Sequence, residues 1–309
     1  MSAIRQAVGQ YLALRRALGF KLHLEGCWLE QFAAFLQRRR ASHITAELAL
    51  EWATMAKAQP AHLTHRLSVV RGFAAFRAAS DPRTEVPALG LLPHRYHRKP
   101  PYIYTDNEIA KLLLAAARLP SRTGLRPRTY ATLLGLLVVT GMRIGEVVAL
   151  DREDVDISGA VLTVRRGKFG KSRLVPVHAT TRRALQRYAD WRDRIQPKTR
   201  SASFLVGESG RRLVVNTIEQ TFVRLSHQIG LRNPDDRTGP RLHDIRHRFA
   251  VNTMLRWYRA GVDVERHLPR LSTYLGHCHF TDTYWYLSAV PELMRLVVAR
   301  LERQKAGPS

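Results

Sequence analysis

Apolar residues near the start of the chain recur at intervals of three or four positions. They include Ile4, Val8, Tyr11 and Leu12, and then Trp28, Phe32, Phe35 and Leu36. This spacing places apolar side chains on one face of a helix, and no alternating strand pattern interrupts it. The pattern predicts an all-helical N-terminal domain over residues 1–86.

The last helix of that domain is predicted over about Leu63 to Ala79. One face would pack against the core, and the other carries Arg66, Arg71 and Arg77. These arginines could contact a phosphate backbone. A solvated amphipathic helix explains this single element equally well, so both interpretations stay open.

A basic, proline-rich segment follows over residues 87–104. Prolines recur along it, and a regular helix cannot accommodate them. The segment also carries Arg95, Arg98 and Lys99. We therefore expect an extended basic linker between two domains.

The spacing of apolar residues changes within the second domain, residues 105–309. Thr105 and Glu108 form a capping-box signature for a helix to about Arg118, and another helix is expected over about 128–139. Residues 161–166 and 172–177 are β-rich runs around a GKFGK turn, which predicts a hairpin. Helical spacing then returns, so the predicted fold is mostly α with a small β-hairpin.

The charge of the chain indicates its partner. There are 50 Lys and Arg against 25 Asp and Glu, a net charge of +25. A two-to-one excess of positive charge is typical of a surface that neutralises phosphates. Nucleic acid is therefore the expected partner, and the basic residues of the helix and the linker are candidate DNA contacts.

Cysteine usage and hydropathy exclude other classes of protein. Cys27 and Cys278 are far apart and predict neither a disulfide framework nor a thiolate zinc site. The longest apolar run, Ala131 to Met142, is shorter than the ~18 residues that a bilayer span needs. The N-terminus does not resemble a secretory signal. We expect a cytoplasmic, nucleoid-associated protein that does not contact the membrane.

Four short segments carry the candidate chemistry, and their order is more informative than any one of them. They are TGMRIGEV around Arg143, RRGKFGKSRLVPV around Lys168, RLHDIRHRF with His243 and Arg246, and YLGHCHFTDTYWY with His277 and Tyr286. Guanidinium and imidazole groups together can bind one phosphate.

This order of Arg, Lys, HxxR, His and Tyr resembles the tyrosine recombinase family, also called phage-type integrases. The motifs carry the resemblance over about Thr105 to Arg300. The N-terminal part resembles the family by architecture alone, because the family has a helical core-binding domain there. It implies an α+β catalytic domain. It also implies a site-specific recombinase that cleaves and rejoins double-stranded DNA through a 3′-phosphotyrosyl intermediate, without metal, ATP or other cofactors.

The resemblance also implies roles for individual residues. Arg143 and Arg246 would hold the scissile phosphate with His277 as a further donor, and Glu146 would orient Arg143. His243 would accept the proton of the nucleophile. A zinc site at His243 and His247 would need a HExxH glutamate or nearby thiolates, which are missing from this motif.

Two assignments keep an alternative. Lys168 matches the first lysine of the family's GKGxK loop and is implied to protonate the leaving 5′ oxygen. Lys171 is its alternative because Phe169 replaces the usual second glycine. Lys171 and Arg173 are also candidate DNA contacts.

Tyr286 is the implied nucleophile because it follows His277 at the spacing of the family, and Tyr284 is the alternative. An unperturbed tyrosine has a pKa near ~10, so the basic residues around the phosphate must ease its deprotonation.

By resemblance the protein would act as a homotetramer on two DNA sites, alone or with partner recombinases. The amphipathic segment Pro291 to Gln304 would dock on a neighbouring protomer or pack in cis. The alternative function is a catalytically inactive or partner-dependent DNA-binding accessory protein of a mobile element. A type IB topoisomerase and a metal-dependent nuclease or transposase are further alternatives.

Overall fold

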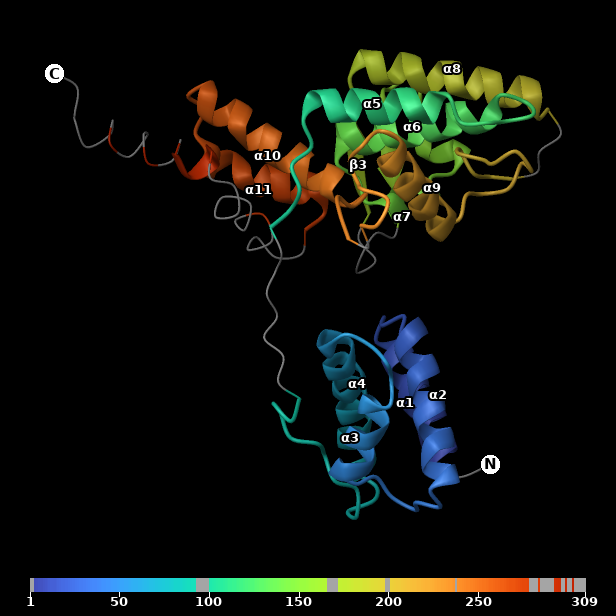
Figure 1. Cartoon of the computed structure of the whole chain (residues 1–309), viewed down its shortest axis with the longest axis vertical. Coiled ribbons are helices and arrows are strands. Elements are labelled where there is room, and N and C mark those ends of the chain that lie inside the picture. Colours follow the sequence, from blue (N-terminus) through green and yellow to red (C-terminus); the bar gives the residue numbers. More distant parts are fainter. Residues whose placement is uncertain are drawn as a thin grey trace. The chain divides into compact units, whose positions relative to one another are not determined.

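The computed structural model describes residues 3–92, 100–165, 172–197, 201–236 and 238–277, together with 283, 292–295, 298 and 302. The chain divides into two compact units, Met1–Lys99 and Pro100–Ser309 (Figure 1). Each unit has its own hydrophobic core.

The described part of the first unit is helical. Its helices are α1 (Ala3–Ala17), α2 (His23–Arg38), α3 (Ala46–Thr54) and α4 (Pro60–Ala78). Helix α2 packs against α1 and α4, and α3 packs against α4. Trp28, Phe32, Trp52 and Phe73 fill the space between them. Helix α4 begins at Pro60, earlier than the predicted Leu63, because proline fits the first turn, where no N–H is needed.

The second unit is built around α6 (Leu125–Thr140). Its buried residues, which include Leu133, Leu134 and Leu137, cover one side of the helix, and the residues on the other side are half-buried or exposed. Four helices pack against it: α5 (Asp106–Ala117), α7 (Ile144–Ala149), α8 (Ala179–Ile195) and α10 (Asp244–Arg259). Helix α9 (Val215–Gln228) packs against α5 and α7.

The capping box predicted at the start of α5 is confirmed. The N–H of Glu108 donates to Oγ1 of Thr105 at 3.2 Å, and the N–H of Thr105 donates to the Glu108 carboxylate at 2.7 Å. Tyr104, just before this box, is buried in the core of the second unit. The start of the helix is thereby fixed both locally and by packing.

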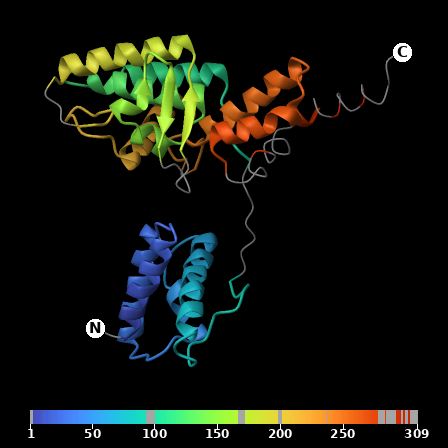
Figure 2. The ribbon, with the colours of Figure 1, turned by 180° about the vertical axis from the view of Figure 1, so that it is seen from behind.

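A three-stranded antiparallel sheet with the order β1-β2-β3 contains the predicted hairpin (Figure 2). Its strands are β1 (Val155–Asp156), β2 (Val161–Val164) and β3 (Arg173–Pro176), and Val164 pairs with Arg173. A short 3-10 helix, Arg152–Asp154, precedes β1. The two-residue strand β1 was not predicted, because two residues are too few to show an alternating pattern.

Helix α11 (Val264–Leu275) packs against α10 and also contacts β3. Together α10 and α11 bury a further apolar cluster that includes Leu293. Gly276 ends α11 in the left-handed conformation, with φ of 68°. The contact with β3 brings the end of α11 to the base of the hairpin. Within the described residues, no helix combines the length and apolarity needed to cross a bilayer.

Candidate active site

Arg143 lies at the junction between α6 and α7. Gly141 ends α6 with φ of 61°, and a Cβ at that position would lie 2.5 Å from Phe249 of α10, so the turn requires glycine. The Arg143 side chain donates to Glu146 Oε1 at 3.0 Å and to the carbonyl of Gly276 at 3.0 Å. This junction holds Arg143 against the end of α11.

Arg246 is buried in the first turn of α10 and reaches the same place. Its Nη1 donates to the carbonyl of Gly141 at 2.8 Å, and its Nη2 donates to the carbonyl of Leu275 at 2.7 Å. The Leu275 carbonyl also accepts from Nη1 of Arg143 at 3.5 Å. One carbonyl oxygen thus brings together the two guanidinium groups that the sequence predicts as a phosphate clamp.

Glu146 is the acidic residue of this cluster, and its side chain is 7% exposed. Burial acts to raise its pKa. Hydrogen bonds from Arg173 and from the N–H of Arg143 outweigh burial, and with the charges of both arginines they lower the pKa of Glu146 to about 2. The carboxylate is therefore ionised at neutral pH.

Arg173, a predicted DNA contact, is paired inside the protein. Its guanidinium faces inward from β3, with the side chain 12% exposed, and forms a bidentate pair with Glu146 at 3.0 and 2.7 Å. The ion pair with a buried carboxylate and the packing between β3 and α11 leave Arg173 little exposed, which speaks against a direct contact with DNA.

His243 immediately precedes α10, and its ring lies edge-on to that of His247, with the ring centroids 4.8 Å apart. The residue is exposed, but neighbouring atoms partly desolvate its ring. This desolvation lowers the pKa of His243 to about 4, and the nearby cations, first Arg246, act in the same direction while Asp244 opposes them. A neutral imidazole at physiological pH can accept a proton.

His277 directly follows Gly276, so it lies next to the carbonyl that binds Arg143. Its Nδ1 lies 2.7 Å from Oγ1 of Thr283, which is buried. The sequence did not single out Thr283, because a threonine in an aromatic-rich run carries no recognisable signal. The described structure thus brings Arg143, Glu146, Arg246, His243 and His277 into one region.

The remaining predicted residues of the catalytic domain lie outside the described residues. They are Lys168, Lys171 and Tyr286, and the alternative nucleophile Tyr284 also lies there. The linker residues Arg95, Arg98 and Lys99 are likewise outside. Their roles stay predictions.

The three arginines predicted on the exposed face of α4 have different environments. Arg66 is buried, lies 3.8 Å from the ring centroid of Trp52 and donates to the Trp52 carbonyl, so the expectation that it is exposed is wrong. Aromatic rings on α2 and α3 draw the side chain into the core. Arg77 pairs with Asp81 at 3.3 Å, and Arg71 is half-buried.

His247 and Arg248, next to the HxxR motif, are both buried. Arg248 donates to the carbonyl of Tyr104 at 2.9 Å and pairs with Asp106. These contacts tie α10 to the start of α5, which makes Arg248 a structural residue.

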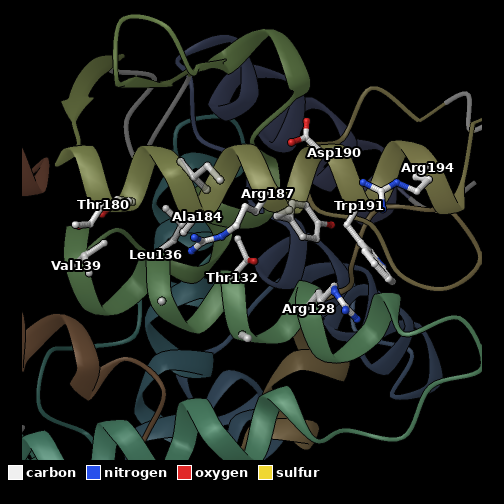
Figure 3. Close-up of a pocket in the computed structure, with 15 residues that line it drawn as sticks. Arg128, Thr132, Leu136, Val139, Thr180, Ala184, Arg187, Asp190, Trp191 and Arg194 are labelled. Carbon is white, nitrogen blue, oxygen red and sulfur yellow. The ribbon is translucent and has the colours of Figure 1, made fainter.

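A groove of about 660 Å³ lies between α6 and α8, away from these residues (Figure 3). Arg128, Arg187 and Trp191 line it, and the guanidinium of Arg128 lies 3.6 Å from the centroid of the Trp191 ring. None of the predicted catalytic residues contributes to it. In the part of the chain that the structure describes, no group of three or more His, Cys, Asp or Glu residues could hold a metal ion.

Comparison with known proteins links this arrangement to a family. Residues 103–292 match the phage integrase family. The chain is 52% identical over 309 residues to a Sinorhizobium fredii (strain NBRC 101917 / NGR234) protein named integrase/recombinase y4rB, with 98% of each protein covered. It is 29% identical over 232 residues to tyrosine recombinase XerC of Chlamydia trachomatis serovar L2, covering 75% of this chain and 68% of XerC.

Solved structures with low sequence identity share the fold. The Tn1549 transposon integrase in complex with transposon right end DNA has a TM-score of 0.67 at 16% identity, covering 98% of this chain and 99% of that one. The XerH site-specific recombinase bound to its difH substrate has a TM-score of 0.61 at 18% identity, covering 84% and 73% respectively.

Proposed function

The chain belongs to the phage integrase family and is a site-specific tyrosine recombinase, and from this premise we propose how its residues cleave DNA. The phenolic oxygen of Tyr286 attacks the scissile phosphorus of double-stranded DNA. A bond forms between this oxygen and phosphorus, and the bond from phosphorus to the 5′ oxygen breaks. The DNA is left attached through a 3′-phosphotyrosyl bond.

Arg143 and Arg246 bind the non-bridging oxygens of that phosphate. The observation that carries this role is their convergence on the carbonyl oxygen of Leu275. Negative charge increases on the non-bridging oxygens during attack, and fixed guanidinium donors stabilise charge where it develops. His277, adjacent to the Gly276 carbonyl that binds Arg143, is a further donor.

Two groups move the protons. His243 accepts the proton of Tyr286, and the lowered pKa that keeps it neutral supports this role. Lys168 donates a proton to the leaving 5′ oxygen, with Lys171 as the alternative. The phosphotyrosyl bond retains the energy of the broken phosphodiester, so rejoining to another 5′ hydroxyl needs no ATP. The guanidinium groups supply the charge stabilisation that a metal would otherwise provide.

Strand exchange requires two DNA sites, and we propose that the protein acts on them as a homotetramer in the cytoplasm, at the nucleoid, alone or with partner recombinases. The first unit binds DNA as the core-binding domain.

The start of the C-terminal segment packs against its own catalytic domain. Leu293 is buried against α10 and α11, and Glu292 pairs with Arg259 of α10 at 2.6 Å. A truncation that tests its role in assembly should therefore remove only residues 296–309. Loss of strand exchange with retained binding to a single site is expected, and unchanged recombination would contradict this role.

Trapping of the covalent intermediate tests the proposed cleavage. The protein is incubated in EDTA with nicked suicide duplexes tiled across the DNA that flanks its own gene, beside the Tyr286→Phe variant. We expect DNA-linked protein on a denaturing gel for the unaltered protein and none for the variant. Site-specific binding without any adduct would instead support an accessory DNA-binding role.

A further inference from the structure

We propose that Arg173 is a positioning residue, which holds Glu146 and, through it, holds Arg143 in the geometry that binds the scissile phosphate. This inference rests on the proposed function and adds to it a residue that does not touch DNA. Arg173 lies at the start of β3, directly opposite Val164 in the hairpin. It therefore connects the base of the hairpin to the clamp.

The contact between Arg173 and Glu146 is bidentate. Nη1 donates to Oε1 at 3.0 Å and Nη2 donates to Oε2 at 2.7 Å, so one guanidinium holds both carboxylate oxygens. Arg143 donates to Oε1 of the same carboxylate at 3.0 Å. One carboxylate thus joins a guanidinium from β3 to a guanidinium at the start of α7.

Arg173 is itself fixed by the end of α11. Its Nε donates to the carbonyl of Tyr274 at 2.7 Å. A Cβ on Gly276 would lie 2.8 Å from Nη1 of Arg173, so glycine at this position leaves the space that the guanidinium occupies. The carbonyl of Gly276 binds Arg143 at 3.0 Å. The end of α11 therefore orients both arginines.

This arrangement has a consequence for Arg143. A buried carboxylate that lost the two hydrogen bonds from Arg173 would depend on Arg143 for its remaining side-chain ion pair. Arg143 would then turn toward Glu146 and away from the phosphate. With Arg173 present, Glu146 needs one hydrogen bond from the Arg143 side chain, and Arg143 keeps donors for DNA.

The principal test is Arg173→Lys, which keeps the charge but cannot form a bidentate contact and also reach Tyr274. On nicked suicide duplexes that the unaltered protein cleaves, we expect adduct formation at saturating DNA to fall about 10- to 100-fold, as for loss of charge-assisted hydrogen bonds. Arg165→Lys is the matched control, because Arg165 flanks the same hairpin turn and pairs with Asp154 and Glu153, not with Glu146. We expect it to cleave at the normal rate.

A duplex with a methylphosphonate at the scissile position separates positioning from a general loss of structure. It lacks one negatively charged non-bridging oxygen, so cleavage depends less on the guanidinium clamp. If Arg173 acts through the clamp, the loss for Arg173→Lys shrinks several-fold on this duplex. An equal loss on both duplexes overturns the inference.

A double mutant keeps the test independent of folding. Combining Arg173→Lys with Glu146→Gln should cost little more than Glu146→Gln alone, because both act on one contact. Additive losses contradict the inference. If the unaltered protein forms no Tyr286-dependent adduct, the proposed function fails and the inference fails with it; normal cleavage by Arg173→Lys overturns the inference alone.

Discussion

Nδ1 of His277 lies 2.7 Å from Oγ1 of Thr283, and this contact joins two segments of the candidate site. Thr283 is 1% exposed, so its hydroxyl is held in place by packing. It also lies three residues before Tyr286 in the chain. A hydrogen bond at Nδ1 fixes the orientation of the imidazole ring of His277, and with it the direction in which Nε2 points.

Thr283→Val keeps the shape of the side chain and removes the hydroxyl. We expect adduct formation to fall by about tenfold, and we expect the protein to lose ~1 kcal/mol of stability, because a part-buried hydrogen bond is removed. Thr283→Ser, which keeps the hydroxyl, is the control. Cleavage rates and urea unfolding measure the two effects. A valine variant as active as the serine variant would show that this contact does not matter for cleavage.

The acid limb of the pH–rate profile reports the state of His243. Its pKa is lowered to about 4 from 6.5, so the ring stays neutral and able to accept a proton below the pH at which an ordinary histidine is charged. Water screens the exposed side of the ring. We therefore expect the acid limb of the cleavage rate, measured at subsaturating DNA, to have its midpoint between about pH 4 and pH 6.5. His243→Gln should lack this limb. A midpoint above 6.5 would contradict the assignment.

Glu146→Gln tests the buried ion pairs through stability. Because the folded-state pKa of Glu146 is lowered to about 2, its stabilising contribution is complete above 4.5 and is lost as the pH falls toward 2. We expect the variant to be about 3 kcal/mol less stable at pH 7. This difference should shrink at pH 3. Glu153→Gln, at a side chain that is 72% exposed, is the control and should change stability little. A pH-independent difference would show that the glutamate is not held ionised by its partners.

Arg66 is expected to stabilise the first unit instead of binding DNA. Arg66→Ala removes a stack on Trp52 and a hydrogen bond to its carbonyl, and should cost about 2 kcal/mol. The slope of log DNA affinity against log salt concentration should stay unchanged in Arg66→Ala. Arg71 is a half-buried arginine of the same helix, and if it contacts a phosphate, Arg71→Ala should reduce this slope by about 1. A reduced slope for the Arg66 variant would place that side chain on DNA.

Locally encoded features were predictable from the sequence. The capping box at Thr105 and Glu108 and the pairing of β2 with β3 depend on residues close together in the chain, and both are confirmed. The mostly helical fold and the family were also predictable, because apolar spacing and motif order survive without knowledge of tertiary contacts.

Side-chain environments set by distant residues were not predictable. Arg173 and Glu146 are 27 residues apart, and Arg173 and Tyr274 are 101 apart, so nothing near Arg173 shows that its charge is paired. Arg66 similarly meets Trp52 from another helix. Both arginines were assigned to DNA because a basic residue in a basic protein gives no local sign of burial.

The most direct test of the proposed mechanism is to locate the covalent bond. Trypsin digestion of the trapped adduct, followed by nuclease trimming, should yield a peptide from Leu271 to Arg295 that contains Tyr274, Tyr284 and Tyr286. Its fragmentation by mass spectrometry is predicted to place the nucleotide on Tyr286. A nucleotide on Tyr284 or Tyr274, or an adduct that persists in the Tyr286→Phe protein, would contradict the assignment of the nucleophile.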